Sequence, residues 1–495
     1  MVPFRSVGEE FNGRVQAIPS LGLGLSVDCY TPDLFDLMKT LSIADLKPAY
    51  LELFKSSAKT LEMVRRHFPD MPMAYHGEGL WITQPDFPDS PCLDEDVRET
   101  VRQLGTIQSY WLNHECATKQ MAGYSFGTYL PPLYTVTSAG VTADNIALVQ
   151  RTVDLTWEGG AEAPLFLLEM APLTYFSAGT IGIPEFFRIV TDRVACGVVL
   201  DIGHLWTLYR YSAVRRKERL EQFVGRFLEA FPLERVVEIH VAGLAEHDAG
   251  RTGDNPEMLP AWIDAHAAPI PSVLWAMLEQ VLVHPGLVNL RAVALEVDTK
   301  AIPLIVEEFQ GTSRRFGEMI RGKMAQTVIP AGLKSRESQA SLDSSAPTAT
   351  ERKQLLDDYD RYARTVSGLM EPTGPEWQAT RADGAGLDRY RRDYLPNEIL
   401  NWGGELAQMF PDVCRALAQR GIALDEFVAW WFRTPRPVEQ SYDFFLLKVD
   451  RFVRFVGERA PAVRPLAEQE GTVLRRAYAD ANDPLQPAPM AELIR

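Results

Sequence analysis

The chain has 495 residues, of which 46% are hydrophobic and 23% charged, a composition typical of globular proteins. This length exceeds that of one ordinary core, so we expect two or three domains, although an α/β barrel alone can take about 250 residues. The formal net charge of −16 argues against a nucleic-acid partner, which needs a basic surface, and no stretch has the ~20 consecutive apolar residues of a membrane span.

Cysteine usage points to a reducing compartment. The five cysteines are odd in number, scattered and without a CxxC pair, so the sequence suggests neither a disulfide framework nor a cysteine zinc site. The first residues, MVPFRSVGEEFNGRVQ, contain no apolar signal segment. We therefore expect a cytoplasmic protein that has neither a membrane nor a nucleic-acid partner.

Short apolar runs recur along the first part of the chain. They are apolar almost throughout instead of alternating, as expected of strands that are covered on both faces. The runs comprise residues 21–28, 49–54, 73–77, 109–115, 164–170, 197–204, 236–243 and 292–298. The first of them contains LGLGL, whose glycines indicate close strand packing more than phosphate binding, because no GxGxxG or GK[ST] motif follows.

Segments with a helical spacing of apolar residues separate these runs. Residues 31–41 are predicted to begin with Thr31 as the N-cap and Pro32 in the first turn, and residues 142–157 to begin with Thr142 as the cap. Eight strands that alternate with helices predict an α/β fold, a (β/α)8 TIM barrel.

The composition changes after the last run. Residues 331–351 are rich in Ser, Ala and Thr and are expected to form a flexible linker between a TIM-barrel domain, residues 1–330, and a smaller all-α C-terminal domain, residues 352–495. The expected helices of the C-terminal domain comprise residues 355–370, 406–421, 424–432 and 442–459.

Most of the histidines fall at or just beyond a predicted strand end. Five of the eight do so: His76, His114, His204, His240 and His266. Because the carboxyl ends of the strands of a TIM barrel gather on one face, where the active site lies, histidines far apart in the sequence should converge there.

Carboxylates add to the same pattern. They are Glu169, Asp201, Asp264 and Glu296. A carboxylate at the end of a hydrophobic strand is unfavourable without a counter-charge, which a metal would supply. Taken singly, His76 or His114 fits a barrel-top histidine bonded to a backbone carbonyl equally well, and Glu296 fits a salt bridge. Together the nine imidazole and carboxylate groups, without a thiolate, predict a site for two or three ions of Zn, Fe or Mn.

The motifs in their order resemble the multinuclear non-heme iron-dependent oxidative enzymes (MNIO), the family that includes the methanobactin and 3-thiaglutamate biosynthetic oxygenases. The resemblance covers roughly residues 18 to 310. It rests on GLGL, YLEL, YHGEGL, WLNHECA, LLEM, LDIGH, EIHVAG, IDAHAAPIP and LEVD.

The resemblance implies a TIM barrel that holds two to three irons in a mixed-valent Fe(II)/Fe(III) state, with O2 as co-substrate. It implies catalytic roles for Asp201 and His240. The iron ligands that it implies are His76, His114, Glu169, Asp201, His204, His240, Asp264, His266 and Glu296. The implied function is oxidation of a residue of a ribosomally made precursor peptide, or of an amino-acid-like thiol, in natural-product biosynthesis.

The C-terminal domain has a resemblance of its own. Residues 390–417 are similar to the helical partner proteins that accompany this family and present the peptide, so the chain is expected to be a fusion of the oxygenase and its partner. Two other classes stay open: a Zn- or Mn-dependent hydrolase or isomerase of the endonuclease IV or sugar-isomerase type, and a non-catalytic binding protein.

Overall fold

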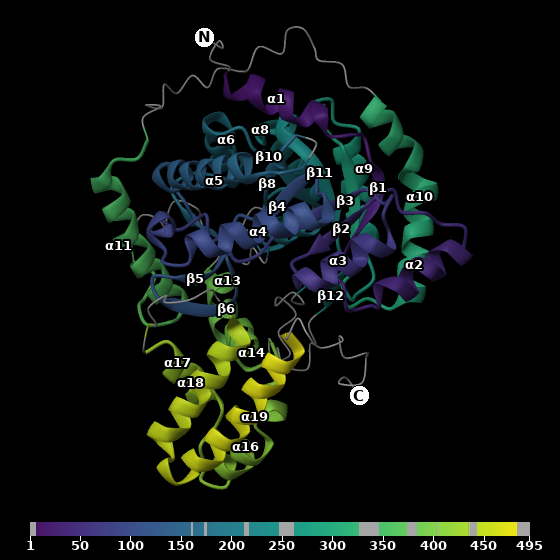
Figure 1. Cartoon of the computed structure of the whole chain (residues 1–495). Coiled ribbons are helices and arrows are strands. Elements are labelled where there is room, and N and C mark those ends of the chain that lie inside the picture. The colour runs from purple at the N-terminus through teal and green to yellow at the C-terminus, as the bar shows by residue number, and fades with distance from the viewer. Residues whose placement is uncertain are drawn as a thin grey trace. The chain divides into compact units, whose positions relative to one another are not determined.

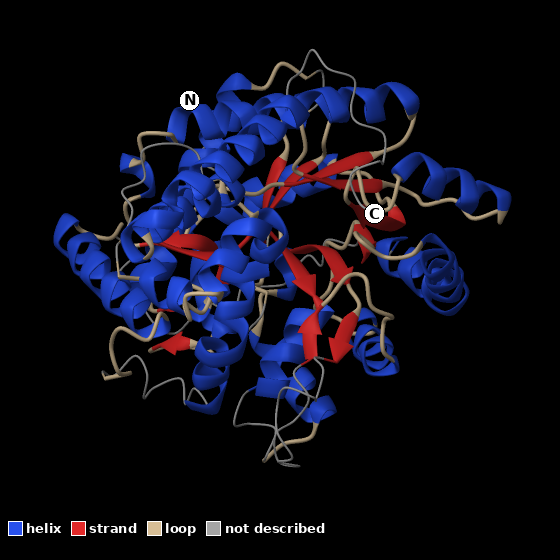
Figure 2. Ribbon diagram, turned by 90° about the horizontal axis from the view of Figure 1, so that it is seen from below, coloured by secondary structure: helices blue, strands red, loops and turns tan. Residues whose placement is uncertain are grey.

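The computed structural model describes residues 6–159, 162–172, 176–211, 217–246, 262–325, 346–373, 384–401, 403–433, 435 and 443–482. A closed barrel of parallel strands occupies the first part of the chain, with each strand paired to its neighbours and β1 paired to β14 (Figures 1 and 2). Its strands are β1 (Gly22–Val27), β2 (Leu51–Phe54), β3 (Met73–His76), β4 (Trp111–Glu115), β8 (Leu165–Glu169), β10 (Gly197–Asp201), β11 (Val236–Val241) and β14 (Ala292–Glu296). Each predicted apolar run contains one of these strands, so the predicted (β/α)8 barrel is confirmed.

Helices surround the strands (Figure 2). They are α1 (Val7–Ala17), α2 (Leu34–Ile43), α3 (Ala58–His67), α4 (Leu93–Ile107), α5 (Val136–Thr156), α6 (Ile183–Arg193), α7 (Ile202–Tyr211), α8 (Leu220–Ala230), α9 (Ser272–Leu282) and α10 (Ile302–Ala325). Short strands lie in the connections: β5 (Thr118–Met121), β6 (Tyr124–Leu130), β7 (Leu133–Tyr134), β9 (Ala178–Gly179), β12 (Leu244–Glu246) and β13 (Trp262–Asp264). Within the described part of the chain, no helix has the length and apolar composition that a membrane crossing requires.

Two predicted helix starts were wrong. Helix α2 begins after Asp33, whose side chain accepts a hydrogen bond from the backbone N–H of Asp36. Helix α5 begins after Thr135, which caps the N–H of Ser138, and Thr142 lies further inside, with its hydroxyl bonded to the Ser138 carbonyl. Asp and Thr are both good caps, so the choice between neighbouring candidates depends on where the strand connection ends and the helical backbone begins.

The interior of the barrel is apolar at the end where the strands begin. The side chains of Phe11 and Val15 on α1 join a cluster with Trp111, Leu167 and Ala292 from the strands. A separate and larger cluster fills the space between the strands and the surrounding helices. The polar groups of the interior therefore lie above an apolar base.

Gly24 of β1 makes room for a neighbouring aromatic ring. A Cβ atom at Gly24 would lie 2.3 Å from the ring of Tyr50, which is fully buried. No such contact can form without movement of the ring, so the prediction of close packing at this strand is confirmed.

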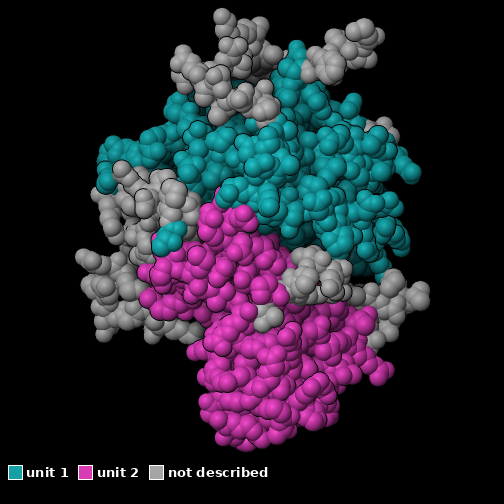
Figure 3. Space-filling model, turned by 90° about the vertical axis from the view of Figure 1, so that its left-hand side faces the viewer, with its two compact units in different colours: residues 1–118, 130–356, 373–384 teal, residues 119–129, 357–372, 385–495 magenta. Residues whose placement is uncertain are grey.

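The chain divides into two compact units (Figure 3). Unit 1 comprises residues 1–118, 130–356 and 373–384, and unit 2 comprises residues 119–129, 357–372 and 385–495. Residues 326–345, which include most of the predicted linker, lie outside the described residues. The predicted division at 331–351 stays a prediction.

Two short 3-10 helices, Phe87–Asp89 and Leu233–Arg235, lie in the first part of the chain, and further helices are described beyond residue 345. They are α11 (Ala349–Val366), α13 (Gly384–Arg389), a π-helix (Tyr390–Tyr394), α14 (Leu395–Asn401), α15 (Leu406–Met409), α16 (Pro411–Ala418), α17 (Asp425–Trp431), α18 (Phe444–Arg459) and α19 (Arg464–Asn482). The predicted helix 406–421 is two helices, because Pro411 cannot donate a hydrogen bond inside a helix and instead begins a new one.

Unit 2 contains the hairpin formed by β5 and β6, which follows β4 directly in the chain. The indole N–H of Trp431 donates to the carbonyl of Ser125 at 2.6 Å, and the rings of Phe126 and Phe432 lie 5.4 Å apart. A Cβ at Gly127 would lie 2.5 Å from the ring of Phe444. A segment of the barrel half of the sequence is thus part of the helical unit.

The packing at Gly24 gives a testable prediction. We expect Gly24→Ala to destabilise the full-length protein by about 1–3 kcal/mol, since the methyl group must displace the ring of Tyr50. Denaturant unfolding measures the change. Gly311→Ala is the matched control: it adds the same methyl group on the exposed face of α10 with nothing within 4 Å, and it should raise stability by up to about 1 kcal/mol. Equal effects at the two positions would contradict the packing argument.

Candidate metal centre

Polar side chains meet inside the barrel at the carboxyl ends of the strands. His76, Glu169, Asp201 and Glu296 are the last residues of their strands, and His240 lies opposite Asp201 in the pairing of β11 with β10. Successive residues of a strand point to opposite faces, so each of these positions shares the interior face of its strand with the residue two positions below it. All five side chains are buried.

Five predicted ligands form a continuous chain of imidazole and carboxylate contacts. His76 Nε2 lies 3.3 Å from Glu169 Oε2, and Glu169 Oε1 lies 3.2 Å from His240 Nδ1. His240 Nδ1 also lies 3.3 Å from Glu296 Oε1, and Glu296 Oε2 lies 3.6 Å from His266 Nε2. Strands far apart in the sequence therefore contribute to one cluster.

His204 joins this cluster from the first turn of α7. Its backbone N–H donates to Asp201 Oδ1 at 2.6 Å, so Asp201 binds the start of the helix that carries His204. Its Nδ1 lies 2.9 Å from the Met170 carbonyl oxygen, and its Nε2 lies 3.8 Å from Asp201. Donation from Nδ1 to the carbonyl leaves Nε2 as the nitrogen with the lone pair, on the side of the carboxylate.

The loop before the last barrel strand contributes the outer edge of the site. His266 is half-buried, and its Nδ1 contacts Asp298. Asp264 ends β13 and is paired with Leu244 of β12, while its side chain is outside what the structure describes. The predicted role of Asp264 stays a prediction.

His114 is held differently. Its Nε2 accepts a hydrogen bond from the backbone N–H of Leu80 at 3.1 Å, and its Nδ1 lies 3.0 Å from the carbonyl of Glu115. Burial lowers the pKa of His114 to about 4, so the ring is neutral. This geometry is that of a barrel-top histidine held by the backbone, the alternative that the sequence left open, and its predicted ligation stays a prediction.

Three glutamates of the interior were missed by the sequence analysis: Glu52, Glu115 and Glu238. All three are buried. Two of them contact the central imidazole, since Glu52 Oε2 is 3.0 Å and Glu238 Oε2 is 3.5 Å from His240 Nε2. A signal was present, because Glu52 interrupts the apolar run YLELF and Glu238 precedes His240 by two positions, which places both on the same face of the strand.

Negative charge is in excess in this cluster. Burial alone raises the pKa of Glu169, but His240 and His76 outweigh it and hold that pKa well below its usual value. Burial lowers the pKa of His76, yet contact with Glu169 and Glu52 raises it to about 9. Protonated imidazoles thus supply the counter-charge, in the place that a metal cation would take.

The pKa values of two further carboxylates, Glu115 and Glu238, are raised. Burial and the nearby Glu169 raise the pKa of Glu115 well above its usual value, and burial and Glu52 raise that of Glu238 to about 8. One oxygen of each, Oε2, has no hydrogen-bond partner within the described residues. Unpaired carboxylate oxygens in a dry interior are costly, and coordination of a cation would satisfy them.

Among the residues that the structure describes, three groups of side chains have the spacing for a metal ion. The groups are Glu52, Glu238 and His240; His76, Glu115 and Glu169; and Glu169, Asp201 and His240. In each group the possible ligand atoms lie within 4.8 Å of one another, and every side chain is buried. Since Glu169 and His240 belong to two groups each, the arrangement is suited to neighbouring ions that share ligands.

The chain is similar to known proteins over the barrel. A family model described as RiPP precursor modification enzyme MbnB/TglH/ChrH matches residues 20–313. A UPF0276 protein of Caulobacter vibrioides is 26% identical over 267 residues, which cover 54% of this chain and 82% of that protein. A UPF0276 protein of Paraburkholderia phytofirmans is 26% identical over 229 residues, 46% of this chain and 65% of its own length.

Solved barrels are much more distant. Endonuclease IV from Thermus thermophilus is 14% identical, with a TM-score of 0.35 and coverage of 61% of this chain and 99% of that one. A D-tagatose 3-epimerase-like protein has the same identity and coverage and a TM-score of 0.36. The barrel assignment rests on the strand pairing itself.

Glu169 should matter more than any other carboxylate for metal binding. We expect Glu169→Ala to lower the number of Mn²⁺ ions bound at saturation further than Glu115→Ala does, because Glu169 belongs to two of the three groups and Glu115 to one. Elemental analysis after dialysis measures the ions, and circular dichroism checks the fold. His284→Gln is the control, since His284 bonds Gly286 and pairs with Glu229 outside the site. Unchanged metal content in Glu169→Ala would refute this arrangement.

Proposed function

We propose that this chain, which belongs to the MbnB/TglH/ChrH family of RiPP precursor modification enzymes, binds two to three iron ions inside its barrel and uses O2 to oxidise a residue of a ribosomally made precursor peptide. An amino-acid-like thiol is the alternative substrate within the same chemistry. The iron and oxygen dependence predicted from the sequence is thus assigned to the histidines and carboxylates that meet inside the barrel.

The observation that carries the proposal is the contact chain from His76 through Glu169, His240 and Glu296 to His266. Buried carboxylates alternate with imidazoles at 3.2 to 3.6 Å, and each imidazole is in contact with a carboxylate that would share its ion. Imidazole and carboxylate ligands suit iron, zinc or manganese, and shared carboxylates suit several ions close together.

Thiolate ligation does not compete with this set. Cys116 directly follows Glu115 at the end of β4, but burial raises its pKa well above the usual value, with Glu115 adding to the effect. Among the described residues, the groups with the spacing for a metal ion contain no cysteine, so their donors are nitrogen and oxygen atoms. A site of this kind leaves coordination positions open for a substrate and O2.

Bound iron would supply the redox chemistry, namely the binding of O2 and the transfer of electrons from the substrate to O2. The chain's own residues hold and orient the ligands. Asp201 binds the backbone N–H of His204, which fixes this imidazole at the start of α7, and Asn113 donates from Nδ2 to Glu169 Oε2 at 2.6 Å. The apolar base of the barrel excludes water from below. We assign the catalytic roles to Asp201 and His240, which would touch the ions.

For the helical unit we propose presentation of the precursor peptide, as the similarity of residues 390–417 to the partner proteins of the family suggests. A precursor peptide with a photo-reactive group in its N-terminal half should then crosslink to residues 384–482 of the full-length protein. Mass spectrometry of the crosslinked fragments measures this. Attachment to unit 1 alone would contradict the presenting role.

The metal and the reaction are tested together. We expect full-length protein reconstituted with Fe(II) to consume O2 in the presence of precursor peptides encoded beside its gene and to change their mass, whereas Zn²⁺-loaded protein should do neither. An oxygen electrode and mass spectrometry give the two readings. Tight stoichiometric zinc or manganese with phosphodiesterase or sugar-isomerase activity would favour the alternative class, and no turnover under any condition would favour a binding protein.

A further inference from the structure

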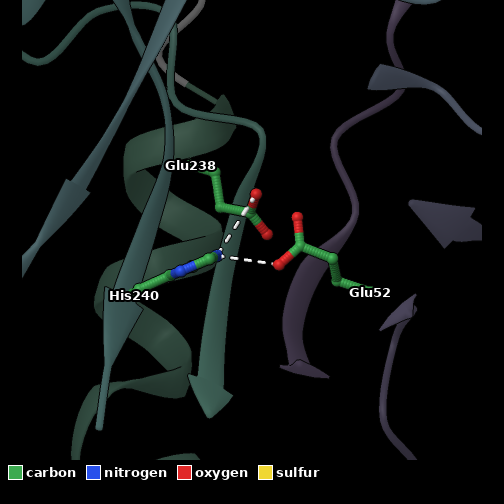
Figure 4. Close-up of side chains that lie close together, drawn as sticks. All are labelled: Glu52, Glu238 and His240. Atoms are coloured by element: carbon green, nitrogen blue, oxygen red, sulfur yellow. Dashed lines mark ion pairs between the residues drawn. The ribbon is translucent and has the colours of Figure 1, made fainter. Parts of the chain in front are cut away.

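The imidazole of His240 lies between two pairs of carboxylates. Its Nδ1 is 3.2 Å from Glu169 and 3.3 Å from Glu296, on the side of the predicted metal ligands. Its Nε2 is 3.0 Å from Glu52 and 3.5 Å from Glu238, on the opposite side (Figure 4). The ring itself is fully buried. A neutral imidazole has one N–H and one lone pair, so the proton on one nitrogen decides which pair of carboxylates faces the lone pair.

Both oxygens of the Glu52 carboxylate accept hydrogen bonds from buried side chains. Its Oε1 accepts from the indole N–H of Trp111 at 3.1 Å, and its Oε2 accepts from the hydroxyl of Ser26 at 2.9 Å. Both donors are fully buried, and the ring of Trp111 is packed within the apolar base, which fixes the direction of its N–H. The carboxylate is therefore held in one orientation, with Oε2 at an ion-pair distance of 3.0 Å from His240 Nε2.

Glu238 is further from His240 Nε2 than Glu52 is and interacts with it more weakly. Its Oε1 accepts the hydroxyl of Tyr50, and the distance of 3.5 Å from its Oε2 to His240 Nε2 is at the limit of a hydrogen bond. Of the two glutamates, Glu52 is the one placed to receive the Nε2 proton.

We propose that Glu52 is a positioning residue, which accepts the Nε2–H of His240 and so directs the Nδ1 lone pair of this histidine towards the metal side of the barrel. The inference rests on the proposed metal site but not on its oxygen chemistry. Carboxylates that receive the second N–H of a metal-binding histidine fix its tautomer and raise its affinity for the metal, and their loss typically costs about 10–100-fold in affinity.

A metal ion held by Glu52, Glu238 and His240 is the competing interpretation of the same side chains. It requires the Nε2 lone pair of His240, so the proton would lie on Nδ1 and His240 could not also ligate an ion on the side of Glu169 and Glu296. The geometry thus favours the positioning role, and the number of bound ions distinguishes the two.

Glu52→Gln is the decisive variant because an amide has one oxygen and one NH2 group. It can accept a hydrogen bond on the Trp111 side or on the His240 side, but not on both. The Trp111 N–H needs an acceptor, so the amide oxygen should take the place of Oε1, and the NH2 group then faces His240 Nε2. Nε2 must accept, the proton moves to Nδ1, and the lone pair is lost from the metal side. Ser26 can rotate its hydroxyl and accommodates either arrangement.

We expect full-length Glu52→Gln to bind Zn²⁺ about 10–100-fold more weakly than the wild type while reaching the same number of ions at saturation. Competition titration with a chelator gives the affinity, elemental analysis gives the count, and circular dichroism checks the fold. Nitrogen-15 NMR of the Zn²⁺-loaded wild type should show His240 bound through Nδ1 and protonated at Nε2. Ser26→Ala, which keeps the carboxylate, is the control and should bind Zn²⁺ nearly as the wild type does.

A second variant separates tautomer control from general damage. Trp111→Phe added to Glu52→Gln removes the donor that orients the amide, so the amide oxygen can turn to His240 and part of the lost affinity should return. The proposal is overturned if Glu52→Gln binds Zn²⁺ with unchanged affinity, if it loses one ion at saturation, or if the double variant binds no better than the single one. Wild-type protein that binds no Zn²⁺ or Fe²⁺ would overturn the proposed function and this inference together, whereas metal binding without O2 consumption would defeat only the proposed chemistry.

Discussion

The interior of this barrel depends on balancing negative charge. The ion pairs that the structure describes for Glu52, Glu169, Glu238 and Glu296 all lead to histidines, at 3.0 to 3.9 Å. Neutral imidazole cannot compensate a carboxylate, so the cluster needs either protons or cations to persist in a dry interior. Protons on His76 and His240 provide one solution, and metal ions provide the one that leaves the histidines as ligands.

The fold confines this cluster to the part of the barrel above its apolar base. Below it the barrel is filled by Trp111, Leu167 and residues of α1, and outside it the strands are covered by helices. Parallel strands covered on both faces leave the interior ends of the strands as the place where polar side chains can converge. The apolar base also supplies two polar groups, the Trp111 N–H and the Tyr50 hydroxyl, and both are directed at the lowest carboxylates.

The cluster accordingly has two layers with different tasks. The upper layer, with Glu169 and Glu296 on His240 Nδ1, has side chains shared between possible metal groups. The lower layer lies on the Nε2 side of His240, where fixed donors bind both oxygens of Glu52 and one oxygen of Glu238. The imidazole of His240 contacts both layers. Its orientation therefore couples the apolar base to the end of the barrel where the predicted metal ligands lie.

The sequence by itself determined the eight strands, because runs of apolar residues covered on both faces are recognisable locally, and it determined that imidazoles and carboxylates end these strands. It could not determine which of them meet. A period of two assigns a side chain to a face, but its height in the barrel depends on the register between strands, and the shift between Val198 and Val199 against β11 sets where Glu238 and His240 lie. For the same reason Glu52 looked like an interruption of an apolar strand, and the ligation of a metal by His114 stays a prediction. The hairpin that begins three residues beyond Glu115 could not be assigned to the helical unit either. Only tertiary contacts place it there, such as those of Phe126 with Phe432 and of Ser125 with Trp431.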